Sequence, residues 1–282
     1  MVLTDWFMHL MLTTCAQVIV GLVVLVSALM AANLISKVTF QTVESVLGYR
    51  RSIYITGWIG TPVHELSHLL VFWIFRIKVI EIKLFTPSSE NAELGRVTYE
   101  LDSKNPLHRL ASSLSGIAPL ALGTSLIVAL GVFLVPGVNL SVSHLVSASP
   151  LVETLGAPYY FSIVLDSTLG SISSLLDSDN LGRWQFWLFM YVSICVACHF
   201  VPSRADLDGS APGIMVGSFL LLLVNAVAMS FWTGPAPFAL FWGKTIGLML
   251  GFFGIALGFS LMLGLTVGAI SFSRCILWPR ST

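Results

Sequence analysis

The residues with the clearest chemical meaning in this chain are two histidines and a glutamate in the segment 61–68. His64 and His68 are four residues apart, so on an α-helix their imidazoles project from one face, one turn apart. Both rings can then bind the same metal ion, with Glu65 beside it. The pattern H-E-x-x-H therefore predicts two zinc ligands and a general base, provided that the segment is helical and a third ligand comes from elsewhere.

The alternative for this segment is a polar network, in which the two histidines hydrogen-bond to each other and to Glu65. We favour the metal site because the flanking residues 53–59 and 69–75 are almost wholly apolar. By analogy with aspartate, a glutamate in the middle of a membrane helix costs about 2.5–3.5 kcal/mol on insertion scales. Ionisable residues at such positions usually mark a functional site.

The composition is that of a membrane protein. Hydrophobic residues make up 56% and charged residues 10% of the 282 residues, and the formal net charge is zero. The mean hydropathy is +0.88. These values exclude a disordered chain and an ordinary soluble domain, and they give no indication of nucleic-acid binding. We therefore expect membrane lipid, and no nucleic acid, around the protein.

A bilayer core of about 30 Å is crossed by about 20 apolar residues in a helix. Six runs of roughly that length lie between polar breaks, and they cover residues 10–36, 53–76, 110–136, 184–201, 212–232 and 243–270. The sequence predicts an all-α, multi-pass integral membrane protein with about six transmembrane helices, forming a single membrane domain over residues 1–282. The runs in 212–270 are expected to pack closely through G-x-x-x-G spacings. These are Gly213/Gly217, Gly247/Gly251, Gly254/Gly258 and Gly264/Gly268.

Residues 77–101, between the second and third runs, have the pattern of a β-hairpin. Two β-branched, partly alternating segments flank a turn-rich stretch at residues 87–91. The hairpin is either a plain connector or an exposed edge that pairs with an extended substrate segment.

The distribution of Lys and Arg predicts the orientation. They are more frequent on the side that holds both termini and the segments 77–109 and 202–211, so the positive-inside rule places both termini in the cytoplasm. Residues 136–181 contain no Lys or Arg, and we expect a non-cytoplasmic loop over 137–182.

Two local predictions concern the helix that carries the motif. Residues 37–51 have an amphipathic spacing that suits a segment lying on the membrane surface. Thr61 and Pro62 have the residue types of an N-cap and a first helical position, so a fresh helix is expected to start just before His64.

The third metal ligand is expected in the segment that follows the run 184–201. Asp206 and Asp208 stand between Pro202 and Gly209, where extended backbone can direct a carboxylate back towards the two histidines. The alternative is a solvated loop whose aspartates cap the next helix. Given the H-E-x-x-H motif, we favour one of the two aspartates as the ligand.

Together these motifs resemble the site-2 protease family of intramembrane zinc metalloproteases, in its minimal six-helix form without a soluble accessory domain. That family has H-E-x-x-H on one helix, a small-residue motif with proline on the next, and N-x-x-P...L-D-G after the one following. The matching residues are His64-Glu65-Leu66-Ser67-His68, Gly116-Ile117-Ala118-Pro119, Pro202 and Leu207-Asp208-Gly209. The resemblance covers residues 53–215, which we treat as the metalloprotease-like core.

The resemblance implies a zinc metalloendopeptidase with one Zn²⁺ per chain, held by His64, His68 and either Asp208 or Asp206. In the family the ligand follows the proline by five residues, whereas these aspartates follow it by four and six. His199 stands where the family has asparagine, so it is expected to position the substrate or to act as a further ligand.

The same resemblance makes Glu65 the general base and a transmembrane segment of a single-span membrane protein the substrate. Control of access is then expected from a regulatory membrane partner or from the loop 137–182. The rival hypothesis is a non-catalytic zinc-binding membrane protein of the same fold that holds a partner helix.

Overall fold

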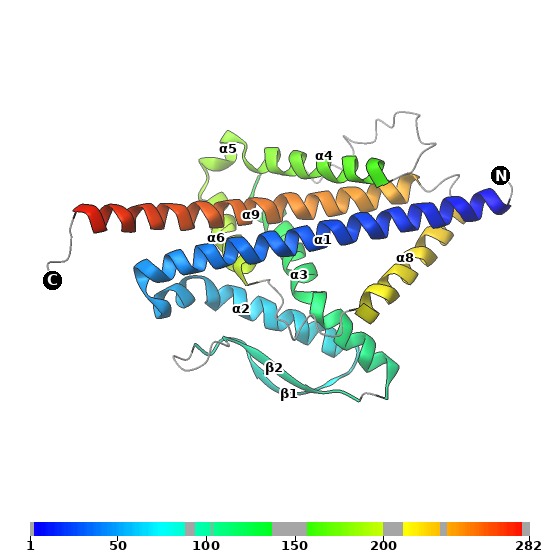
Figure 1. The fold of residues 1–282 in the computed structure, drawn as a ribbon, viewed down its shortest axis with the longest axis horizontal. Coiled ribbons are helices and arrows are strands. Elements are labelled where there is room, and N and C mark those ends of the chain that lie inside the picture. Colours follow the sequence, from blue (N-terminus) through cyan, green and yellow to red (C-terminus); the bar gives the residue numbers. More distant parts are fainter. Residues whose placement is uncertain are drawn as a thin grey trace.

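The computed structural model describes residues 3–87, 94–102, 104–136, 157–199, 211–231 and 236–277. The chain is mostly helical, with one small antiparallel sheet (Figure 1). The helices are α1 (Leu3–Leu47), α2 (Tyr49–Ile74), α3 (Pro106–Leu134), α4 (Ala157–Leu175), α5 (Ser178–Leu181), α6 (Trp184–Cys198), α8 (Ala211–Phe231) and α9 (Ala236–Leu277). The strands are β1 (Lys78–Lys83) and β2 (Arg96–Glu100).

Among the described residues, three helical stretches are long and apolar enough to cross a membrane: Thr4–Leu47, Pro106–Leu134 and Trp242–Ile270. Shorter apolar helices cover Phe161–Leu175, Trp184–Cys198 and Met215–Val227. The all-α class and the membrane-protein character agree with the sequence. The number of six transmembrane helices remains a prediction. The side of the membrane on which each terminus of the chain lies also remains a prediction.

The long helices form one layer of the molecule. α1 and α9 run side by side, and α4 lies along α9 (Figure 1). α1 does not end near residue 36, where the apolar run ends, but continues to Leu47. Gly48 then separates it from α2 with φ +80°, a conformation that glycine adopts without steric cost. The expected surface segment 37–51 is therefore the end of α1 and the start of α2.

The predicted restart of a helix at Thr61 and Pro62 is wrong, because α2 is one helix with Pro62 inside it. Thr61 Oγ1 is buried and has no hydrogen-bond partner, so it caps nothing. Proline removes one helical hydrogen bond, but α2 packs against α3, α6 and both strands along its length. This tertiary packing keeps the helical path, as most helical stability in proteins comes from packing.

α4 lies within the segment 137–182, for which the sequence predicts a loop. Its serines and threonines, together with Asp166, interrupt the apolar run and hide the helix from a search for about 20 apolar residues. The position of this segment relative to the membrane remains a prediction.

The glycine spacings of α9 explain how α4 and α1 approach it. A Cβ on Gly251 would lie 2.9 Å from the carbonyl oxygen of Thr168 on α4, and a Cβ on Gly264 would lie 3.1 Å from Thr39 Cα on α1. Close packing is therefore confirmed for two of the predicted G-x-x-x-G pairs. Around Gly254 and Gly258, by contrast, no atom of the described chain lies within 4 Å of such a Cβ.

The predicted hairpin over residues 77–101 is confirmed. β1 pairs with β2 in antiparallel register from Lys78 opposite Glu100 to Lys83 opposite Arg96, with an irregularity between Val79 and Glu81. The hairpin extends along α2 (Figure 1).

Aromatic contacts hold the hairpin against α2 at both ends. The ring centroids of Phe72 and Tyr99 are 4.1 Å apart, and those of Tyr54 and Phe85 are 5.8 Å apart. Between these contacts, the backbone just before β2 passes beside Glu65.

Candidate metal centre

The H-E-x-x-H segment lies where three helices meet. α2 packs against both α3 and α6, and α3 packs against α6. The core beside this junction contains Ile127 from α3, Phe189 from α6 and Phe252 from α9, all fully buried. Asn105 is the N-cap of α3, and its side chain accepts a hydrogen bond from the backbone N–H of Leu107 at 2.9 Å. This cap fixes the start of the helix that faces the motif.

The rings of His64 and His68 converge, as their spacing on a helix predicts. Their Nε2 atoms are 3.1 Å apart. In a tetrahedral site with Zn–N distances of about 2.0–2.1 Å, two nitrogen ligands are about 3.3 Å apart. The separation of the two Nε2 atoms therefore fits a zinc ion with little movement of either ring.

The outer nitrogens of both rings are held by other helices. Nδ1 of His64 lies 2.8 Å from the main-chain oxygen of His199, at the end of α6. Nδ1 of His68 lies 2.8 Å from Oγ of Ser115 on α3. Histidines that bind metals almost always have such a partner on the second ring nitrogen, which orients the ring. The described residues therefore supply two possible metal ligands, and each has a partner on its outer ring nitrogen.

Glu65 is buried, with 8% of its surface exposed. A Cβ on Gly95, just before β2, would lie 2.7 Å from Glu65 Cγ and 3.0 Å from Glu65 Oε1. A glycine at this position lets the hairpin backbone lie directly against the glutamate. The strand β2 therefore starts beside the predicted general base.

His199 contributes to the site through its main chain. Its ring Nδ1 lies 3.0 Å from the carbonyl oxygen of Cys195, one turn earlier on α6. The ring packs against α2, because Cβ atoms on Gly57 and Gly60 would lie 3.5 Å and 2.6 Å from its nitrogens. The main-chain oxygen, rather than the imidazole, reaches His64 in this structure. The predicted role of the His199 ring towards substrate or metal stays a prediction.

A stripe of polar side chains on α6 sets the position of His199. Tyr191, Cys195 and His199 follow one another at four-residue intervals on the face towards α2. The hydroxyl of Tyr191 donates to the carbonyl oxygen of Ile55 at 2.7 Å and accepts from Trp58 Nε1 at 3.0 Å. The hydropathy of this apolar run does not reveal the stripe, but polar residues at intervals of four in an apolar helix indicate a shared face.

At Gly60, α2 and α6 approach each other closely. A Cβ there would overlap the carbonyl oxygen of Cys195 as well as the His199 ring. We expect Gly60→Ala to displace the His199 carbonyl from His64, to lower zinc affinity and to cost about 1–3 kcal/mol of stability, as overpacking commonly does. Zinc titration and thermal unfolding in detergent measure both effects.

The matched control for this substitution is Gly217→Ala on α8, where no atom of the described chain lies within 4 Å of the added Cβ. Gly217→Ala should behave as the wild type. Zinc affinity unchanged in Gly60→Ala would show that the approach of α6 does not support the metal centre.

Asp206 and Asp208 lie outside the described residues. The segment that contains them follows His199, whose carbonyl oxygen is 2.8 Å from His64 Nδ1. Asp206 and Asp208 follow His199 by seven and nine residues, and seven residues of extended chain already span up to about 25 Å, so chain length alone does not keep either aspartate from the histidine pair. In the part of the chain that the structure describes, no group of three or more His, Cys, Asp and Glu side chains could hold a metal ion.

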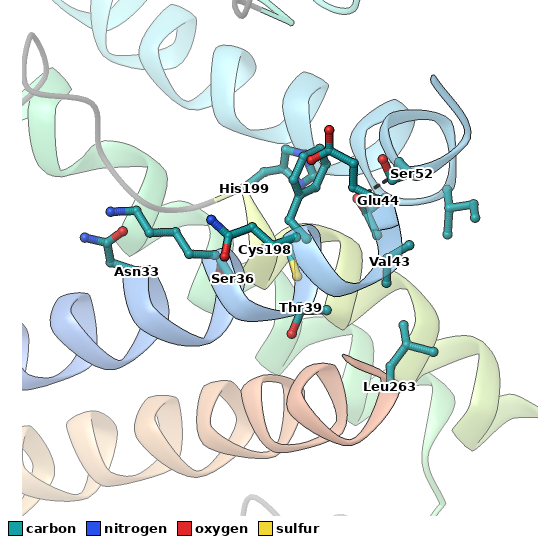
Figure 2. Close-up of a pocket in the computed structure, with 14 residues that line it drawn as sticks. Asn33, Ser36, Thr39, Val43, Glu44, Ser52, Cys198, His199 and Leu263 are labelled. Carbon is teal, nitrogen blue, oxygen red and sulfur yellow. Dashed lines mark hydrogen bonds between the residues drawn. The ribbon is translucent and has the colours of Figure 1, made fainter. Parts of the chain in front are cut away.

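A cavity of about 450 Å³ lies behind His199, between α1, the start of α2 and the end of α6 (Figure 2). Its α1 wall carries polar residues every three or four positions, and its α2 wall carries hydroxyls. They are Asn33, Lys37, Gln41 and Glu44 on α1, with Ser52 and Thr56 on α2. In the sequence this polar spacing suggested a segment on the membrane surface. In the structure it lines a cavity that shares the residue His199 with the candidate metal centre.

Comparisons of the chain with protein-family models, with curated proteins and with solved structures give no match. The assignment of a function therefore depends on the site itself.

Proposed function

We propose that this chain is an intramembrane zinc metalloprotease that hydrolyses a peptide bond in a transmembrane segment of a membrane-protein substrate. The observation that carries this proposal is the pair of Nε2 atoms 3.1 Å apart beside a buried glutamate, with each outer nitrogen held by another helix. His64, His68 and either Asp206 or Asp208 would hold the ion.

A bound zinc ion supplies Lewis acidity, which polarises the scissile carbonyl and lowers the pKa of water towards about 7. Glu65 takes a proton from the attacking water and transfers it to the leaving amine. Its burial against Gly95 holds the carboxyl group in one place and limits its contact with bulk solvent. The chain thus has candidates for both the ligand set and the general base.

We assign the other requirements of the reaction, an extended substrate and water, to the hairpin and the cavity. A helical substrate has its carbonyl groups hydrogen-bonded within the helix, so it must unwind before cleavage. A segment paired with the edge of the hairpin would be extended and would pass close to Glu65, because β2 begins beside that residue. The cavity behind His199, whose surface is mostly apolar but includes polar side chains of α1 and α2, is proposed to hold water next to the site.

The test of this function uses the full chain purified in detergent. We expect equimolar zinc and cleavage of single-span membrane peptides. Equimolar zinc without cleavage of any such peptide would favour the non-catalytic alternative, a zinc-binding membrane protein that holds a partner helix. A purified chain that neither binds zinc nor cleaves such peptides would exclude the proposed function.

The third ligand is tested by Asp206→Ala and Asp208→Ala, made separately. One of the two variants should lose zinc and activity, and the other should retain both and serve as its control. If both variants keep equimolar zinc, neither aspartate is the third ligand, and His199→Ala becomes the next variant to measure.

A further inference from the structure

We infer that Asn225 is a positioning residue of the metal centre, which fixes α8 on α1 and thereby sets where the segment with the expected third ligand enters α8. This inference rests on the zinc-binding part of the proposed function and does not require proteolysis. It follows from a buried polar cluster, far from His64 and His68 in the sequence, that the proposed mechanism does not use.

The cluster joins two apolar helices by side-chain hydrogen bonds. Nδ2 of Asn225 on α8 donates to Oγ1 of Thr14 at 2.9 Å and to Oε1 of Gln17 at 2.7 Å, both on α1. Asn225 is 1% exposed and Gln17 is 0% exposed. Because a buried amide without a partner is costly, these bonds decide which face of α8 meets α1. A single buried asparagine sets the register of paired helices in the same way.

The stability of the helix pair does not by itself explain the cluster. Nε2 of Gln17 and Oγ1 of Thr13 are buried, and neither has a hydrogen-bond partner in the described part of the chain. Replacement of hydrogen-bonded partners by apolar groups of the same shape can be neutral or stabilising. Apolar side chains would therefore hold the two helices together equally well, but without a preferred direction. The polar cluster thus points to a requirement for one placement of α8.

The rest of α8 packs loosely against the described chain. Among its described side chains only Asn225 and Met229 are buried, and both lie in its last third. Met215 and Phe219, nearer its start, are more than half exposed. α8 runs from α3 to α1 (Figure 1), and about 21 Å of helix separates Asn225 from the start at Ala211. A tilt of about 5° at Asn225 would therefore move that start by about 2 Å.

Such a displacement matters because the two aspartates come shortly before the start of α8. Asp208 precedes Ala211 by three residues and Asp206 precedes it by five. Extended chain limits their distances from Ala211 to about 11 Å and about 18 Å. A metal ligand has to keep its distance to the ion within about 0.2 Å. The placement of α8 therefore limits where either carboxylate can join His64 and His68.

The first experiment measures zinc affinity of the full chain in detergent by competition with a chelator. Asn225→Leu should bind zinc about tenfold more weakly, which corresponds to the loss of two interhelical hydrogen bonds. Thr14→Val should have a smaller effect, and Thr14→Ser, which keeps the hydroxyl, should bind as the wild type does. The matched control is Ser230→Ala, because the Ser230 hydroxyl donates within α8 to the Ala226 oxygen at 2.8 Å. Wild-type affinity in a folded Asn225→Leu variant would overturn the inference.

A second readout distinguishes positioning from a merely structural role. The variant that combines Thr14→Val, Gln17→Leu and Asn225→Leu should unfold at the wild-type temperature or above, because all the paired polar groups are replaced together. Its zinc affinity should nevertheless be about tenfold lower than that of the wild type. A merely structural cluster would instead change the unfolding temperature and leave the zinc affinity of the folded variant unchanged. That result would contradict the inference.

A third measurement needs no variant, so it remains decisive if the substitutions prevent folding. The coupling between two sites acts equally in both directions. Zinc added to the wild type in detergent should therefore slow amide hydrogen exchange in α8 around Asn225, while exchange in α4 stays unchanged and serves as the control. If exchange around Asn225 does not respond to bound zinc, the inference is wrong.

The outcomes also separate this inference from the proposed function. A chain that shows the Asn225 effects but cleaves no peptide would leave the inference standing and overturn the protease. A protease whose zinc affinity does not depend on Asn225 would do the reverse. A wild-type chain that binds no zinc would overturn both.

Discussion

Glu65→Gln is expected to lower the rate of peptide cleavage by about 10²–10⁴-fold, the usual contribution of a general base, while the protein keeps its zinc. Glutamine has nearly the same size as glutamate, so the contact with Gly95 is preserved. Its amide cannot take a proton from the attacking water. Single-turnover cleavage of a membrane peptide, with zinc content measured on the same sample, tests both parts.

The control for this prediction is Glu81→Gln on β1. The Glu81 side chain is 50% exposed and pairs with Lys83 at 2.9 Å, away from the histidine pair. The Glu81→Gln variant should cleave the peptide at the wild-type rate. Undiminished cleavage by Glu65→Gln would sink the proposed mechanism, because that mechanism requires Glu65 to take the proton from water.

Replacement of His64 by alanine is expected to reduce the zinc content from equimolar to background and to abolish cleavage. His64 supplies one of three expected protein ligands, and its ring is the one held by the His199 carbonyl at 2.8 Å. Elemental analysis after dialysis against a weak chelator measures the loss. His64 is partly exposed, so the substitution removes the ligand with less damage to packing than a change at the buried His68.

The control for this substitution is His108→Ala. His108 lies near the start of α3, where its Nδ1 accepts from the backbone N–H of Asp102 at 3.2 Å. It is a histidine of the same chain with a local structural role, and its loss should leave the zinc content unchanged. Equimolar zinc in His64→Ala would mean that the zinc ion is bound elsewhere in the protein.

The sequence predicted the parts of the site whose geometry is local. His64, Glu65 and His68 lie within five consecutive residues, and the helical repeat alone places the two rings on one face. The hairpin was also predictable, because its strands are adjacent in sequence and their alternation is a local pattern.

The partners of these residues could not be predicted in the same way. The His64 ring is oriented by a main-chain oxygen. Every residue type has such an oxygen, so the residue type at position 199 does not indicate this contact. Ser115 looks in the sequence like any small residue of a membrane helix. The need for glycine at position 95 is visible only in the structure, where the backbone at this position packs against Glu65. Each contact depends on how α2, α3, α6 and the hairpin come together.

The errors in helix boundaries have a similar cause. A hydropathy search ends α1 where the apolar residues end, whereas the helix continues through residues that line the cavity. Pro62 was expected to begin a helix because proline is favoured at a first turn. Neighbouring elements instead hold it inside α2.

The hydrogen bond from His64 to the His199 carbonyl joins residues 135 positions apart in the chain. At synthesis rates of about 5–20 residues per second, the ribosome makes His199 roughly 7–27 s after His64. During that interval the rest of α2 and the hairpin are synthesised, but the oxygen that lies beside the first histidine has not yet been made. The candidate metal centre can therefore be completed only after α6 has been made, and we expect any stable metal loading to follow the synthesis of α6.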